Sequence, residues 1–346
     1  MDRASYLIRR ILLVIPTFLG ITVVCFSLTR LLPGGPVEIQ LLKMRNIGGV
    51  ESRSGLGVSQ VTEEYRQELT KQFGFDRPVA VQFWNWLVKN RMGMRVHSYS
   101  YPNRTAWQLI SSRMPVSLWF GLISFVLSYL ICIPLGIAKA LCHRRSFDAV
   151  SSLLVFAAYA IPAFALGMVL KMLFCGTVEG LFDVFPLGGF ESDFATAPSS
   201  IGRFADRAWH MALPVACYVA SDFAVLTLIM KNSLLDQIAS DYVRTVLAKG
   251  ASRRRAIWGH AFRNALIPIA TGFGSVLGVL FAGSIIIENI FEIPGMGRLS
   301  WDALTGRDYA VFMALLSLTA LIQLVGNLLS DFCYMFIDPR IHFGKS

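Results

Sequence analysis

Six long apolar stretches constrain the fold of this chain more than any other feature of its sequence. They cover residues 11–32, 115–141, 149–177, 209–230, 265–287 and 310–337. Each supplies about the 20 apolar residues with which a helix crosses a hydrocarbon core of roughly 30 Å. Because lipid offers the backbone no hydrogen-bond partner, only helices and closed barrels span a bilayer. The stretches therefore predict an all-α integral membrane protein with six transmembrane helices.

Positive charge gathers on one side of the predicted membrane. The two chain ends and the loops after the second and fourth spans carry Arg3, Arg9, Arg10, Lys139, Arg144, Arg145, Lys231, Arg244, Lys249, Arg253, Arg254, Arg255, Arg263, Arg340 and Lys345. The short loops on the other side, within 179–206 and 288–308, are acidic. The positive-inside rule therefore places both termini and the loop 231–264 in the cytoplasm. Since the net charge of +10 follows this topology, we expect no nucleic-acid partner.

The spans divide the chain into four parts. Residues 1–32 are the N-terminus and first span, which is too long for a signal peptide and lacks a small-residue cleavage site. Residues 33–114 form a sizeable extracytoplasmic loop, in which a helix is predicted over 62–74 and another from 76 onward. Residues 115–337 form the core, and residues 338–346 a cytoplasmic tail. Pro134, Pro162 and Pro214 are predicted to bend the spans that contain them.

The cytoplasmic loop 231–264 reads as an amphipathic helix-turn-helix. Leu235, Tyr242 and Val246 recur at helical spacing and form one apolar stripe with Ile238 or Ala239. Gly250 suits the left-handed backbone conformation in which many helices end, and Ser252 can cap the next helix.

The second helix of this hairpin opens with three cations, at residues 253–255. Positive charge beside the positive end of a helix dipole costs about 0.3–1 kcal/mol for each exposed group. A feature that opposes local stability suggests an external ligand. Anionic membrane lipid and the acidic surface of a protein partner both remain possible explanations.

Two segments of the hairpin carry a family resemblance. Residues 242–250 read Tyr-Val-Arg-Thr-x-x-Ala-Lys-Gly, and residues 263–268 read Arg-Asn-Ala-Leu-Ile-Pro. Both resemble the coupling loop in permease subunits of binding-protein-dependent ABC importers, in the dipeptide/oligopeptide/nickel branch. The chain departs from the general Glu-Ala-Ala pattern, where it has Arg244-Thr245-Val246, but it keeps the glycine and the late proline.

The resemblance extends along nearly the whole chain. It includes Leu-Pro-Gly-Gly-Pro at 32–36, Pro-Leu-Gly-Gly-Phe at 186–190, the segment 288–297 and Asp-Pro-Arg-Ile at 338–341. Within the branch, the chain most resembles B-type permeases for oligopeptides and microcin C.

This resemblance implies a type I ABC importer permease fold in the bacterial inner membrane and a transport subunit that is not itself an enzyme. It implies a heterodimer with a second permease subunit, two ATP-binding subunits that hold ATP and Mg²⁺, and an extracytoplasmic solute-binding protein. The implied coupling residues are Asp241, Tyr242, Arg244, Thr245, Ala248, Lys249, Gly250, Arg254, Arg263, Asn264 and Pro268. Peptides are the expected cargo; nickel import by the same family, or a proton-coupled carrier, is the alternative.

Asp222 is the one acidic residue centrally placed in a predicted span. Ionisable groups in spans usually face a cavity or a partner helix, so Asp222 is predicted either to line the pathway or to bond a neighbouring helix. The chain has no P-loop and no HExxH or GxSxG motif, and its histidines and cysteines are scattered. We therefore expect no cofactor, metal or catalytic site in this chain.

Overall fold

The computed structural model describes residues 3–31, 35, 37, 38, 41, 56–72, 74–177, 182–192, 200–271, 281 and 283–337. These residues are helical apart from turns, loops and two isolated β-bridges, so the all-α prediction is confirmed for them. By length and composition three helical segments can each cross a membrane: Ile8–Arg30, Ala106–Leu141 and Tyr309–Phe332. Two bent helix pairs raise the number to five. Residues 272–280 and 282 of the predicted span 265–287 lie outside the described residues.

The chain folds into two compact units. The first unit comprises Met1–Arg10, Met114–Arg298 and Ile322–Ser346, and the second comprises Ile11–Arg113 and Leu299–Leu321. Each unit is described below by itself.

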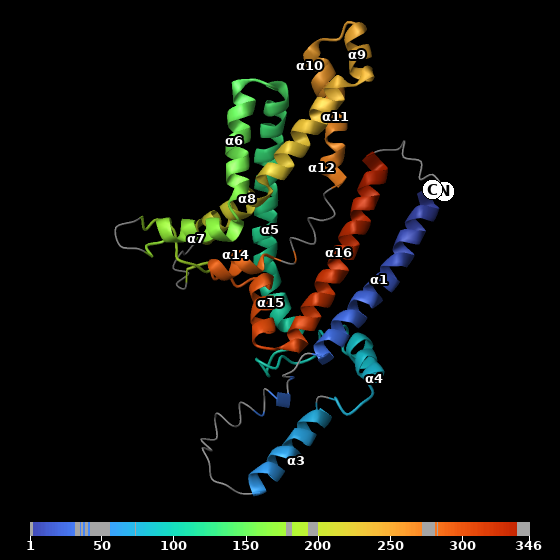
Figure 1. Ribbon diagram of the computed structural model, residues 1–346, viewed down its shortest axis with the longest axis vertical. Coiled ribbons are helices and arrows are strands. Elements are labelled where there is room, and N and C mark those ends of the chain that lie inside the picture. Colours follow the sequence, from blue (N-terminus) through green and yellow to red (C-terminus); the bar gives the residue numbers. More distant parts are fainter. Residues whose placement is uncertain are drawn as a thin grey trace. The chain divides into compact units, whose positions relative to one another are not determined.

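Long helices build the first unit. They are α5 (Ala106–Leu141), α6 (Ser146–Ala160), α7 (Ala163–Phe174) and α8 (Ser200–Ala239), to which α14 (Ile285–Ile290) is added late in the chain. Figure 1 shows α7 turning sharply away from α6, and both helices contact α8. A cluster of buried side chains from α5, α8 and the segment around α14 forms the core of this unit.

The predicted span 149–177 is two helices that meet at 90°. Proline at 162 precedes α7 and lacks a backbone N–H, while Ile161 before it is extended. A residue before proline is driven out of the helical region, so the break follows directly from the sequence. By contrast, α5 continues through Pro115 and Pro134, and α8 bends by 49° between Ala220 and Phe223.

The second unit contains α3 (Leu56–Gln72), α4 (Val79–Trp84) and the π-helical turn η1 (Asn85–Lys89). It also contains most of α1 (Arg3–Leu31) and α15 (Met296–Thr305), and the first part of α16 (Tyr309–Ile337). Gly74, at φ +68°, follows α3, which confirms the predicted end of that helix. Trp86 is buried against Phe26, Phe83 and Met313, so it is a core residue.

Candidate functional site

The predicted hairpin is present and is the candidate functional site. It consists of α9 (Asp241–Ala248), α10 (Arg253–Ala256) and the π-helical turn η2 (Ile257–Ala261). The chain then returns through α11 (Phe262–Ala265) and α12 (Ile267–Thr271). Figure 1 shows α9 and α10 beyond the end of α8, and α11 and α12 lie against α8.

Two predicted residues form the turn of the hairpin. Gly250 has φ +87°, the left-handed conformation that glycine adopts without steric cost. The Ser252 hydroxyl accepts a hydrogen bond from the backbone N–H of Arg255 at 3.3 Å and so caps α10. The helix-turn-helix prediction is confirmed in both details.

The inner face of the hairpin is tightly packed. Val243, Ala256, Ala261 and Ala265 are at most 2% exposed. They form a cluster with buried residues of α5 and α8, which are Ile137, Ala140, Met230 and Leu234. Alanine side chains let the backbones approach closely, so the hairpin and these two helix ends form one packed body.

Two of the predicted coupling residues bind each other inside the hairpin. The Asn264 side-chain amide donates to the Tyr242 hydroxyl at 3.1 Å, and that hydroxyl donates to the side-chain oxygen of Gln237 at 2.7 Å. The Ser233 hydroxyl donates to the backbone carbonyl of Ala265 at 2.9 Å. These bonds connect the last turns of α8 with the returning segment, so Tyr242 and Asn264 hold the shape of the hairpin.

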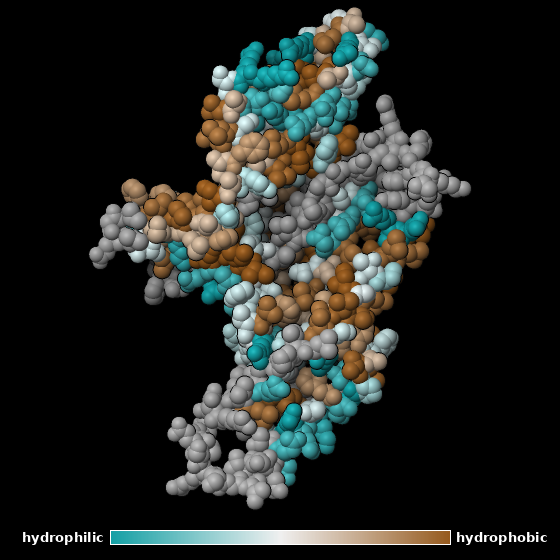
Figure 2. Space-filling model, in the orientation of Figure 1, coloured by the Kyte–Doolittle hydropathy of each residue, from teal (hydrophilic) through white to brown (hydrophobic). Residues whose placement is uncertain are grey.

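The other predicted residues lie on its outer surface or, for Arg263 and Pro268, on the returning helices α11 and α12. The exposed residues among them are Asp241, Arg244, Thr245, Ala248, Lys249, Gly250, Arg254, Arg263 and Pro268. Asp241 and Arg244 form an exposed ion pair at 3.6 Å, which contributes little stability in water. Figure 2 shows hydrophilic residues gathered over the hairpin.

Sequence reasoning missed two apolar residues of this surface. Leu247 is 41% exposed and Trp258 is 47% exposed. The Trp258 ring packs on Phe262, with 5.4 Å between the ring centroids. Tryptophan and arginine are the residue types that dominate the energetics of protein interfaces. A tryptophan three residues after a run of arginines was the available signal.

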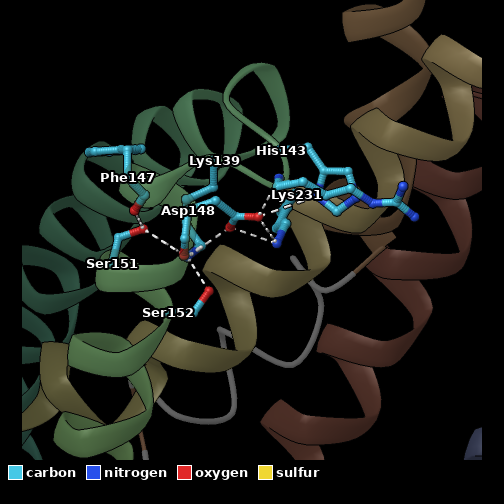
Figure 3. Close-up of polar contacts among 8 residues, drawn as sticks. Lys139, His143, Phe147, Asp148, Ser151, Ser152 and Lys231 are labelled. Carbon is cyan, nitrogen blue, oxygen red and sulfur yellow. Dashed lines mark hydrogen bonds and ion pairs between the residues drawn. The ribbon is translucent and has the colours of Figure 1, made fainter.

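A buried cluster of charges lies near the hairpin and was also missed. Asp148, in the first turn of α6, accepts two hydrogen bonds from the Lys231 ammonium at 2.7 and 2.9 Å. The Lys139 ammonium lies 3.4 Å from the same carboxylate. It also donates to the hydroxyls of Ser151 and Ser152 at 2.9 and 2.7 Å. Figure 3 shows Asp148 between the two lysines.

This cluster joins three helices through one carboxylate. Lys139 comes from α5, Asp148 from α6 and Lys231 from α8. Lys139 is fully buried and Asp148 nearly so. Charges out of water require close partners, so the pairing specifies how these helix ends meet. The sequence analysis assigned both lysines to membrane topology alone; an aspartate in an otherwise basic loop was the signal for the pairing.

A second buried carboxylate lies in the segment 288–297. Glu288 is fully buried in the first unit. Its side chain accepts hydrogen bonds from the Ser117 hydroxyl at 3.0 Å and from the backbone N–H of Arg298 at 2.8 Å. The Ser117 hydroxyl in turn accepts from the backbone N–H of Met296 at 2.7 Å. A Cβ at Gly295 would lie 2.5 Å from the carboxylate, which explains the glycine there. Burial raises the pKa of Glu288 to about 7.

Asp222 lies in α8, but its side chain is outside the described residues, so its placement in a pathway stays a prediction. In the part of the chain that the structure describes, no three His, Cys, Asp or Glu residues are grouped so as to hold a metal ion.

The chain belongs to a known family of transport proteins. Residues 132–343 match the family of binding-protein-dependent transport system inner membrane components. A peptidoglycan transport system permease protein, YejB, from Agrobacterium fabrum is 37% identical over 363 residues, which cover 99% of each chain. An inner membrane ABC transporter permease protein YejB from Escherichia coli O157:H7 is 35% identical and covers 98% of this chain and 99% of its own. The oligopeptide transport system permease protein AppB from Bacillus subtilis is 32% identical and covers 98% and 100%.

Family membership confirms the recognition of the chain from its sequence. The chain is the inner-membrane permease component of an ABC transporter, with several membrane spans, and is not the ATPase. A binding-protein-dependent ABC transporter implies an ATPase and a binding protein as partners. This membership disagrees with the alternative of a proton-coupled carrier.

Proposed function

We propose that this chain forms half of the pathway by which peptides enter the cell in an ATP-driven importer. The observation that carries the proposal is similarity over 98% or more of the chain to permeases named for peptide cargo. These include the oligopeptide permease AppB and dipeptide permeases DppB at 31% identity. Nickel is the alternative cargo within the branch that the sequence resembles.

The assembly that we propose has the composition expected from the sequence. The chain has six spans in a type I importer permease fold, with both termini and the hairpin in the cytoplasm. It pairs with a second permease subunit, two ATP-binding subunits that hold ATP and Mg²⁺, and an extracytoplasmic solute-binding protein. The chain itself binds no cofactor.

In this proposal the hairpin is the contact with an ATP-binding subunit. Its outer surface combines cations with Leu247 and Trp258, which suits a groove with an apolar floor and an acidic rim. Because its inner face shares a core with α5 and α8, displacement of the hairpin moves both helix ends with it. The Asp148 cluster extends that body to α6. Asp222 is proposed to face the pathway that these helices open and close.

Substitution at the turn of the hairpin tests the coupling. No atom lies within 4 Å of a Cβ built on Gly250, so Gly250→Val acts through backbone conformation alone. Valine at φ +87° costs at least about 1–2 kcal/mol and distorts the turn. We expect the variant to reach the membrane but to hydrolyse ATP without peptide uptake. Gly20→Val in α1 is the control, because a Cβ at Gly20 also meets nothing within 4 Å, its φ is not positive and it lies outside the hairpin.

Cargo and partners are tested separately. Cells that lack the chain should lose uptake of isotope-labelled di- to oligopeptides, and uptake should return with the wild-type gene. Lost nickel uptake with normal peptide uptake would assign the other cargo. A pull-down of the tagged chain in mild detergent should recover an ATP-binding subunit and a second permease. Recovery of the chain alone, even after cross-linking, would contradict the proposed assembly.

A further inference from the structure

The second unit contains a cavity of about 690 Å³ that plays no part in the coupling hairpin. Its wall includes the end of α1, the turn η1 with the residues that follow it, and the start of α16. The volume is in the range of small-molecule and cofactor sites, roughly 300–1,000 Å³.

The wall of this cavity is strongly cationic. Arg30, Lys71, Arg77 and Arg95 line it, and Glu38 provides the single carboxylate among the described residues of the wall. None of the four cations forms an ion pair with another residue of the described ranges. An excess of positive charge around a cavity attracts an anion.

The position of Arg30 is held by two aromatic rings. Its guanidinium carbon lies 4.7 Å from the ring centroid of Phe26 and 4.3 Å from that of Phe75. Stacking of this kind leaves the edge of the guanidinium free to donate hydrogen bonds to an oxyanion.

The polarity of the wall changes with depth in the membrane. Arg30 is the last residue of one span and Tyr309 the first of another, so both lie at the level of the lipid headgroups. Phe26 and Met313 also line the cavity, and each lies one helical turn, about 6 Å, further into its span. Both are buried. The cavity is therefore charged at headgroup level and apolar on the hydrocarbon side.

Two buried polar atoms of residues in this wall have no hydrogen-bond partner among the described residues. They are the indole nitrogen of Trp86 and the side-chain oxygen of Gln82. Trp86 is 8% exposed. The Gln82 amide nitrogen is occupied by the backbone carbonyl of Arg77 at 2.6 Å. Both atoms have almost no accessible surface, so they lie behind the surface of the wall and do not contact the cavity directly.

We propose that this cavity binds the phosphate-bearing headgroup of an anionic phospholipid in the leaflet that faces away from the cytoplasm. The phosphate lies among the four cations, and the acyl chains leave past the apolar side of the cavity. A zwitterionic headgroup carries its own cation and gains less from the excess positive charge. The site goes beyond peptide transport and does not depend on which cargo the importer carries.

Native mass spectrometry of the purified importer complex with added phosphatidylglycerol tests the proposal. The variant Arg77→Gln with Arg95→Gln removes two exposed cations of the wall. Lys89→Gln with Arg104→Gln is the matched control, because it removes two exposed cations of the same unit that do not line the cavity. Each cation beside an anionic lipid contributes about fivefold in affinity, so we expect about a thirtyfold loss in the first variant and none in the control.

Parallel titrations with phosphatidylcholine and with inorganic phosphate distinguish the sources of the phosphate. Preference for phosphatidylglycerol that disappears only in the cavity variant supports the site. Equal binding of phosphatidylcholine, an equal loss in the control variant, or binding of inorganic phosphate without binding of the lipid would overturn it. Thermal unfolding of each complex shows whether the variants are folded.

Discussion

The carboxylate of Asp148 allows the sharpest test of how this membrane domain is held together. In Asp148→Asn the side chain keeps its shape but loses its charge. Lys231 then loses both of its charge-assisted hydrogen bonds, and the fully buried Lys139 keeps only hydroxyl and carbonyl partners. Two ammonium groups remain without a counter-charge at the junction of α5, α6 and α8.

The expected loss of stability is large because the carboxylate removed is the shared partner of both lysines. Breaking a buried ion pair by removal of one member typically costs about 3–5 kcal/mol, since the remaining charge is left desolvated. We expect a decrease of this size in the free energy of unfolding, measured by denaturation of the purified chain in mixed micelles. Asp236→Asn, an identical chemical change at an exposed position of α8, the helix that carries Lys231, should stay within about 0.5 kcal/mol of wild type.

A triple variant separates charge from packing. Lys139→Met with Asp148→Leu and Lys231→Met replaces the whole cluster by apolar groups, a change that is often neutral or stabilising. It should therefore recover most of the stability lost in Asp148→Asn. A value for Asp148→Asn within about 0.5 kcal/mol of wild type would refute the reasoning, because it would mean that the carboxylate does not balance the buried lysines.

Two further predictions concern the first unit. A Cβ on Gly136 of α5 would lie 2.7 Å from Met230 Cβ and 2.8 Å from the Thr227 carbonyl oxygen of α8, so Gly136→Ala should lower the free energy of unfolding by about 1–3 kcal/mol through overpacking. Gly20→Ala is the control, because a Cβ there has no neighbour within 4 Å. Equal changes in the free energy of unfolding for the two variants would contradict the close crossing of α5 and α8. Glu288 has its pKa raised from 4.5 to about 7 by burial, so the fold favours its neutral form. The contribution of Glu288 to the free energy of unfolding should therefore be greatest below about pH 4.5 and fall by about 3 kcal/mol as the pH rises to about 7. Glu288→Gln should remove this dependence, and an unchanged pH profile in that variant would rule out Glu288 as its source.

The hairpin combines surfaces with two different roles. Its inner alanines and valine are shielded by α5 and α8, whereas its arginines, Leu247 and Trp258 remain exposed. The three cations at the start of α10 oppose the helix dipole, so they do not stabilise the hairpin itself. A surface that costs local stability and exposes interface-type residues fits the docking role proposed here.

Local features of the sequence determined the class of protein and the outline of the hairpin. The length of an apolar stretch decides whether a helix can cross a bilayer, and the backbone in lipid leaves no alternative to a helix except a closed barrel. The positive φ of Gly250, the cap at Ser252 and the break before Pro162 also depend on neighbouring residues alone. These were therefore predictable, as was the family, from motifs spread along the chain.

Only the tertiary structure decided which distant groups meet. Asp148 and Lys231 are 83 positions apart, and Ser117 and Glu288 are 171 apart. A lysine near the end of a span has the same local pattern whether it faces water or a buried carboxylate, so sequence reasoning assigned Lys139 to topology. Exposure of Trp258 depends in the same way on packing that no local pattern encodes. Pairings between helices follow from how whole helices pack, and that packing depends on side chains far apart in the sequence.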